Sequence, residues 1–201
     1  MNINLPDSAK IGKTVPKKKF LEKIRDGKIK RDFEKIAKIV WSYNLSPETI
    51  NLNGTDKVEE IQIFAITLKI REIPKKAIEA INKLIPYPIL FLLQYENEKI
   101  FAINYKEKNK FFFSNWNEDK TFDFSGKNLE EIYKNIIMSF LEVKSKTFEE
   151  SLELQSRLDF LKREIKSVEN KIKKEKQFKY KVELNKKLIT LKEELKKIKS
   201  P

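Results

Sequence analysis

The chain has 201 residues and a formal charge of +13, with neither cysteine nor histidine. The two absences exclude disulfide frameworks, thiol and imidazole metal sites, and catalysis by Ser-His-Asp or Cys-His systems. No apolar run approaches the ~18 residues that a membrane span needs, so we expect a cytoplasmic protein with no membrane partner.

The positive charge lies at the two ends of the chain. Residues 1–31 have a net charge of +7 and residues 147–201 a net charge of +6, whereas the charges of residues 32–146 cancel. Basic ends attract polyanions such as nucleic acid, although a Lys-rich soluble protein without any ligand has the same composition. The candidate nucleic-acid-binding residues are two lysine triplets: Lys17, Lys18 and Lys19, and Lys173, Lys174 and Lys176.

The first third of the chain predicts an arm, a short helix and a strand. Residues 1–15 have few apolar anchors, so we expect an irregular arm. A short helix starting near Lys17 has its apolar residues on one face and ends at Asp26 and Gly27. From Lys35 to Leu45 apolar residues alternate, which indicates a half-buried strand, although Phe33, Ile36, Ala37 and Val40 also fit a helix.

The most clearly patterned segment is residues 58–70, which predicts a strand that is apolar on both faces. Its two faces are Ile61, Ile63 and Ala65 on one side, and Phe64, Ile66 and Leu68 on the other. Such a strand belongs in the middle of a sheet covered on both sides.

The following elements extend this sheet. An amphipathic helix over residues 74–85 leads to a buried strand over 89–93, which suggests a parallel pair joined by a right-handed crossover. The next predicted elements are a hairpin strand over 100–105, a strand over 110–116, and a helix from Asn128 to about Val143 with Asn128 and Glu131 as a reciprocal N-cap.

Residues 147–199 contain neither Gly nor Pro and have many Lys and Glu residues. Two apolar stripes have coiled-coil spacing, one from Leu154 to Ile172 and one from Leu184 to Ile198. The two registers do not join, so we predict a helical hairpin that turns near Lys173–Tyr180, with one long helix as the alternative.

We therefore predict an α/β (α+β) fold: a mixed sheet of about five strands flanked by helices, followed by a C-terminal coiled-coil helical hairpin. The expected parts are an N-terminal arm (1–15), an α/β core domain (16–145) and a basic helical tail (146–201).

Several strings of the chain resemble a family of bacterial proteins. They are Val15-Pro16-Lys17-Lys18, the segment from Trp41 to Asn51, Glu60-Ile61-Gln62-Ile63-Phe64, the segment from Ile85 to Phe91, and Glu175 to Asn185. In these strings the chain is similar to the domain of unknown function 4391. The resemblance implies a cytoplasmic protein whose relatives tend to be encoded beside helicases and DNA methyltransferases of restriction or defence systems. It implies no established activity.

One group of residues suggests catalysis. Glu48 precedes Glu60 and Gln62, and the last two lie on one face of the central strand. Two carboxylates that hold Mg²⁺, with Gln62 orienting a water, resemble a variant metal-dependent nuclease site, in which Glu48 and Glu60 are the metal ligands. The simpler explanation is that the acids are solvated and that Gln62 binds a neighbouring backbone group.

The aromatic run from Phe111 to Trp116 could stack on single-stranded nucleic acid, or Phe111 and Phe113 could belong to the core.

The function that we expect is a non-catalytic accessory protein of a bacterial DNA-processing or restriction and phage-defence system, without a cofactor. It would bind a partner protein, such as a helicase or DNA methyltransferase, through the tail, and nucleic acid through its basic ends. Alternatives are a Mg²⁺-dependent nuclease and a purely structural assembly protein that oligomerises through the tail.

Overall fold

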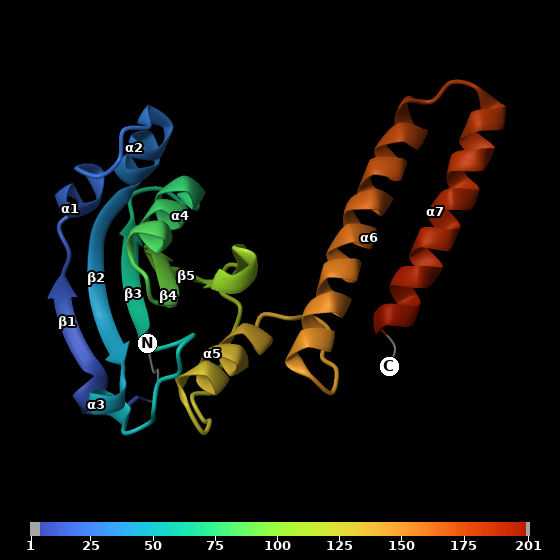
Figure 1. Cartoon of the computed structure of the whole chain (residues 1–201). Helices are drawn as coiled ribbons and strands as arrows, with labels where there is room; N and C mark the ends of the chain where they lie inside the picture. The colour runs from blue at the N-terminus through green and yellow to red at the C-terminus, as the bar shows by residue number, and fades with distance from the viewer. Residues whose placement is uncertain (1–4, 200–201) are drawn as a thin grey trace. The chain divides into compact units, whose positions relative to one another are not determined.

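The computed structural model describes residues 5–199 and contains two compact units, Met1–Phe140 and Leu141–Pro201 (Figure 1). The first unit holds all the strands, and the second holds the two C-terminal helices. Residues 1–4 of the predicted arm lie outside the described residues.

Six strands form one mixed sheet, in which each strand is bonded to its neighbours in the sequence. The strands are β1 (Lys10–Thr14), β2 (Ile36–Leu45), β3 (Ile61–Leu68), β4 (Ile89–Tyr95), β5 (Glu98–Tyr105) and β6 (Lys110–Phe113). Strands β3 and β4 are parallel, and the other neighbours are antiparallel. The mixed sheet flanked by helices is confirmed, with one strand more than about five.

The additional strand is β1, so the prediction of an irregular arm is wrong for Lys10–Thr14. This segment pairs antiparallel with β2, and its register shifts between Lys10 and Lys13. Gly12 lies in this shift with a φ of 67°, a conformation that glycine adopts without strain. Of the five residues only Ile11 is partly buried, so β1 depends on backbone bonds to β2 that no side-chain pattern reveals.

Strand β3 occupies the predicted central position, with β2 on one side and β4 on the other. The side chains of Ile61, Ile63, Phe64 and Ile66 are all at most 2% exposed, which confirms a strand buried on both faces. Helix α4 (Lys75–Leu84) connects β3 to the parallel strand β4, in agreement with the strand–helix–strand pattern of the sequence.

Helices cover both faces of the sheet. Helix α1 (Lys18–Leu21), helix α2 (Gly27–Glu34) and α4 contribute to one core cluster with the strand residues Phe64, Phe91 and Ala102. Helix α5 (Leu129–Met138) lies on the opposite face, where the Tyr133 hydroxyl donates to the backbone carbonyl of Asn104. A short helix, α3 (Pro47–Ile50), and two 3₁₀ turns, Asp7–Ala9 and Lys106–Lys108, complete this unit.

The predictions missed helix α2, which fills the interval between Asp26 and the strand β2. The Asp26 carboxylate caps this helix by accepting from the backbone N–H of Lys28 at 2.6 Å. Ile29 and Phe33, the two apolar residues of this segment, are spaced four apart as on one face of a helix, and Phe33 is buried. The pattern from Lys35 to Leu45 is a strand and not the alternative helix.

Helix α5 begins as predicted, but its cap is only half reciprocal. The Asn128 side chain accepts from the backbone N–H of Glu131 at 2.9 Å. The Glu131 carboxylate accepts from Lys127 at 2.7 Å and not from the N–H of Asn128 itself. The helix ends at Met138, five residues before the predicted end at Val143.

The second unit is the predicted helical hairpin. Helix α6 (Phe148–Lys174) and helix α7 (Phe178–Lys199) lie side by side and are joined by residues 175–177 (Figure 1). Ion pairs join the two helices: Arg157 with Glu194, Lys187 with Glu164, and Lys192 with Glu169. No helix within residues 5–199 combines the length and apolar character that a membrane crossing requires.

Candidate functional site

An open pocket lies at the carboxyl end of the central strand β3. Its volume is about 820 Å³, and it is open to solvent. Three parts of the first unit surround it: helix α2, the β3–α4 connection with the first turn of α4, and the loop after β6. The lining residues are Lys28, Arg31, Asp32, Lys35, Arg71, Glu72, Ile73, Lys75, Lys76 and Trp116. Ligands of open α/β sheets bind outside the carboxyl ends of strands, which is the position of this basic pocket.

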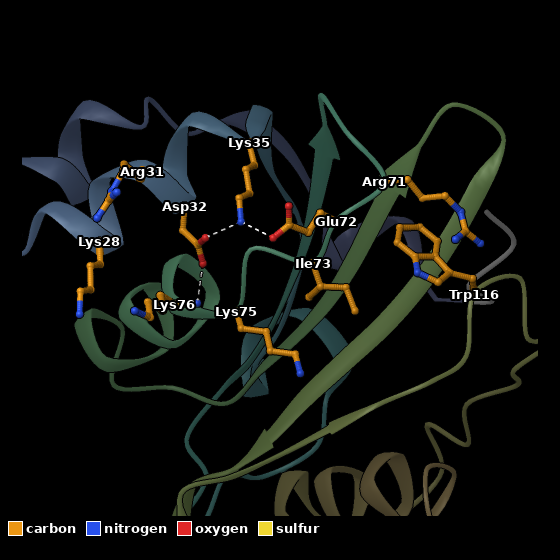
Figure 2. A pocket seen from close by; sticks show the side chains of 10 residues that line it. All are labelled: Lys28, Arg31, Asp32, Lys35, Arg71, Glu72, Ile73, Lys75, Lys76 and Trp116. Carbon is orange, nitrogen blue, oxygen red and sulfur yellow. Dashed lines mark hydrogen bonds and ion pairs between the residues drawn. The ribbon is translucent and has the colours of Figure 1, made fainter.

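An ionic network crosses the middle of the basic pocket (Figure 2). The Lys35 ammonium pairs with Asp32 at 2.8 Å and with Glu72 at 2.5 Å. Hydrogen bonds to these two carboxylates raise the pKa of Lys35 above its ordinary value, Asp32 having the larger effect. Lys35 is therefore protonated, and two carboxylates balance its charge. Its ion pairs join helix α2 to the β3–α4 connection.

Four other cations of the pocket have no carboxylate partner within residues 5–199. Lys28 and Arg31 project from α2, and Lys75 and Lys76 from the first turn of α4. None of the four makes an ion pair with a described residue, although the Lys75 ammonium lies 5.5 Å from the centre of the Phe113 ring. In total the pocket has six basic side chains and two acidic ones, a formal net charge of +4.

Arg71 and Trp116 form the far wall of the pocket (Figure 2). The guanidinium carbon of Arg71 lies 5.0 Å from the centre of the Trp116 ring, within the range of a cation–π contact. Glu98, at the start of β5, accepts two hydrogen bonds from the same guanidinium. These bonds raise the pKa of Arg71 and lower the pKa of Glu98 from their ordinary values.

This chemistry suits a ligand that bears several negative charges. Unpaired Lys and Arg side chains on two helices can bind phosphate oxygens at more than one point. The described residues contain no group of three Asp, Glu, His or Cys side chains that could hold a metal ion. The charge and the unpaired cations of the basic pocket therefore suit an anion.

The predicted triplet at Lys17 lies outside this pocket. The Lys17 ammonium donates to the backbone carbonyl of Ile36 at 2.6 Å, and burial lowers its pKa. Lys18 forms an exposed pair with Glu22 at 3.8 Å, whereas Lys19 is exposed. Of the three, Lys17 thus has a contact that fixes α1 against the strand β2.

The second predicted triplet lies at the turn of the hairpin. Lys173 and Lys174 end α6, and Lys176 lies in the connection to α7. All three side chains are exposed. A groove of about 540 Å³ at this end of the hairpin includes Lys174, Tyr180 and Lys187 together with Glu175 and Glu183. Acids and bases nearly balance there, so the net charge is much lower than in the basic pocket.

The three residues of the predicted nuclease site have separate local partners. The Ser46 hydroxyl donates to the Glu48 carboxylate at 2.6 Å, which lowers the pKa of Glu48. Glu60 lies before β3, and its charge is the main cause of the raised pKa of Tyr87. Gln62 is buried on β3, opposite Asn44 of β2.

The aromatic run divides between two environments. Phe111 and Phe113 pack against the core cluster, whereas Phe112 is buried on the other side of the strand, with the Lys110 ammonium over its ring. Only Trp116, the last member of the run, lines the basic pocket.

Of the pocket residues, the sequence analysis singled out only Trp116, as the last member of the aromatic run, and none of the cations as binding residues. One signal was present: Lys75 and Lys76 follow Pro74 at the start of the helix that comes after the central strand, and ligands of open α/β sheets bind near such connections. The contributions of Lys28 and of Trp116 depend on how α2 and the loop after β6 pack, which has no local signal.

Fold and pocket together define a mixed α+β protein with a basic pocket at the carboxyl end of its central strand and a C-terminal helical hairpin. The chain belongs to the family described as a domain of unknown function (DUF4391), whose model matches residues 3–195. The expected resemblance is therefore confirmed over nearly the whole chain. Comparisons with curated proteins and with solved structures found no match.

Proposed function

We propose that this protein is a non-catalytic, cytoplasmic accessory protein that binds nucleic acid through the basic pocket and a partner protein through the helical hairpin. The observation that carries the nucleic-acid proposal is the set of four cations around the pocket at the end of β3 that have no carboxylate partner among the described residues. Such cations release counterions from phosphates when nucleic acid binds, which favours binding at low salt.

The test is fluorescence anisotropy with labelled DNA at several salt concentrations. The variant Lys28→Glu/Arg31→Glu/Lys76→Glu reverses three charges in the pocket. We expect its affinity to fall at least about thirtyfold, with a salt slope reduced by up to about three units, because each phosphate that is no longer bound accounts for about one.

The matched control reverses the same number of charges on the same unit. Lys10, Lys13 and Lys38 are exposed on β1 and β2 and do not line the pocket. We expect Lys10→Glu/Lys13→Glu/Lys38→Glu to reduce affinity by no more than about threefold, because these exposed lysines do not line the pocket and salt screens their charges. An equal loss in both variants would show that net charge, not the pocket, attracts the DNA. No binding by the parent protein at low salt would refute the proposal.

The same assay separates binding from catalysis. With Mg²⁺ present, we expect the DNA to stay intact. Cleavage that is lost in Glu60→Ala would favour the nuclease alternative, with Glu48 and Glu60 as metal ligands.

For the partner protein, exposed apolar side chains on α7 are the supporting observation. Phe178 is 82% exposed and Ile189 is 59% exposed. We propose that they contact a helicase or DNA methyltransferase of a DNA-processing or phage-defence system. Phe178→Ser/Ile189→Ser should prevent co-purification with that enzyme, whereas the exposed control Lys179→Ser/Thr190→Ser should not. Co-purification that is unaffected by the first variant would exclude this face.

A further inference from the structure

The guanidinium of Arg71 is held from two sides. The Trp116 ring lies 5.0 Å from its carbon, and Trp116 is itself packed against the core cluster. Glu98 accepts from both Nε and Nη2 of Arg71, the second bond being 3.3 Å long. Glu98 also accepts from the side-chain amide of Asn117 at 3.3 Å. These contacts set the plane of a side chain that would otherwise rotate freely.

Arg71 differs in this respect from the other cations of the pocket. Its charge is already balanced by Glu98, and a phosphate at this point would meet the negative charge of that carboxylate. Yet the Arg71 side chain remains 53% exposed. A planar group that is fixed, neutralised and exposed suits stacking better than ion pairing.

We propose that Arg71, supported by Trp116, is a stacking platform for an unpaired base, and that the ligand of the basic pocket is single-stranded nucleic acid. This inference rests on the proposed function. Guanidinium planes stack on nucleic-acid bases, as aromatic side chains do. Lys28, Arg31 and Lys76 lie across the pocket from Arg71 (Figure 2) and then bind phosphates of the same strand.

The preference for single-stranded nucleic acid follows from the geometry of stacking. In a duplex both faces of each internal base are covered by neighbouring bases, whereas an unpaired base can present a face to the protein. Stacking accepts every base, so the preference is for unpaired strands rather than for a sequence.

The experiment compares three ligands on the full-length protein: a single-stranded oligonucleotide of about 16 nucleotides, an abasic strand of the same length, and a duplex. The abasic strand keeps the phosphates and lacks the bases, so the ratio of the two single-strand affinities isolates stacking. We expect the parent protein to prefer the strand with bases by about tenfold and to bind it more tightly than the duplex.

Two arginine variants distinguish the contribution of the planar guanidinium group from that of its positive charge. Arg71→Lys keeps the charge and removes the plane, so we expect most of the tenfold preference to disappear while the affinity for the abasic strand stays within about twofold. Arg31→Lys is the matched control, because Arg31 lines the same pocket without lying over a ring. It should leave the preference unchanged.

A third variant removes the group that orients Arg71. Glu98→Gln raises the net charge, so a purely electrostatic role for Arg71 predicts tighter binding of both single strands. The stacking proposal instead predicts a smaller preference for bases, with the abasic strand bound at least as tightly as before.

Equal weakening of both single strands by Arg71→Lys would overturn the stacking platform and leave the proposed function standing. Tighter binding of the duplex would overturn the single-strand inference. If the parent protein binds no nucleic acid at low salt, the proposed function fails as well.

Discussion

The carboxylate of Asp32 accepts a hydrogen bond from the backbone N–H of Lys76, with 2.8 Å between Oδ2 and N. Asp32 lies in the last turn of α2 and Lys76 in the first turn of α4, so one carboxylate joins two helices that are far apart in the sequence and adjacent in space (Figure 1). The first amides of a helix have no partner within it, and Asp32 supplies one. Its other oxygen pairs with Lys35.

We expect Asp32→Ala to lower the free energy of unfolding by about 1–2 kcal/mol, because it removes this capping bond and leaves Lys35 with one carboxylate fewer. Urea denaturation measures the change. Glu34→Ala is the matched control, an exposed carboxylate on the same helix, and should change stability by less than about 0.5 kcal/mol. Similar losses in both variants would mean that the α2–α4 bond contributes little.

The pair of Arg71 and Glu98 predicts a dependence of stability on pH. A hydrogen bond from Arg71 lowers the pKa of Glu98 below its ordinary value of 4.5 in the folded protein. A carboxylate with a lowered pKa stabilises the fold above its unfolded pKa and loses that contribution as the pH falls through its folded pKa. The parent protein should therefore melt at a higher temperature than Glu98→Gln at neutral pH, and the difference should vanish in acid.

Melting curves of the two proteins, from neutral pH to well below 4.5, test this expectation. Glu79→Gln is the control, because it removes an exposed carboxylate on α4 that forms no ion pair within residues 5–199. If the difference in melting temperature between the parent protein and Glu98→Gln stayed constant or increased in acid, it would contradict the assigned role of the Arg71–Glu98 pair.

The lysine triplets outside the pocket should have smaller and different effects. Neutralising Lys173, Lys174 and Lys176 to Gln should flatten the salt slope of DNA binding by up to about one unit for each phosphate that these lysines bind. Within the first triplet, Lys17→Gln should instead reduce stability by about 1 kcal/mol, because its ammonium bonds the Ile36 carbonyl. Gel shifts and urea curves measure the two effects. A Lys17→Gln variant of full stability and weakened binding would reverse this assignment.

The core beneath α4 depends on large side chains of the central strands. Phe91 of β4 is completely buried between rings of β3 and β6. Phe91→Ala should cost about 3–5 kcal/mol of unfolding free energy, because a cavity replaces the ring. The same substitution at Phe178, which is 82% exposed, should cost less than about 0.5 kcal/mol. Comparable losses at both positions would contradict the burial on which the fold rests.

The hairpin can be tested by spin labels at Ser156 on α6 and Lys197 on α7. Arg157 and Glu194, close to these positions, form an ion pair of 2.6 Å, so the two labels should lie within about 3 nm of each other. One continuous helix between the same positions would separate them by about 6 nm. A distance distribution centred near the longer value would refute the hairpin.

The central strand, the crossover to β4 and the folded tail could all be predicted from the amino-acid sequence. Each has a signal within a few turns or residues: apolar residues on both faces of β3, a stripe on α4, and two leucine registers that cannot join into one seam. Local periodicity indicates which side of a helix or strand is buried, so that side can be predicted without knowing which element packs against it.

The pairing of β1 and the position of the basic pocket depend instead on how distant segments pack. The positions of the lysines in the sequence predicted basic ends. Lys28, Arg71 and Trp116, however, come from three separated segments. They line one pocket only after α2 packs beside α4 and the loop after β6 packs on the β3–α4 connection. Whether a cation is available for a ligand also depends on its neighbours. Lys17 is bonded to a carbonyl and Lys35 to two carboxylates, whereas Lys28 has no such partner in the part of the chain that the structure describes. Charge is a property of the sequence, but the field that a ligand meets depends on distances across the fold.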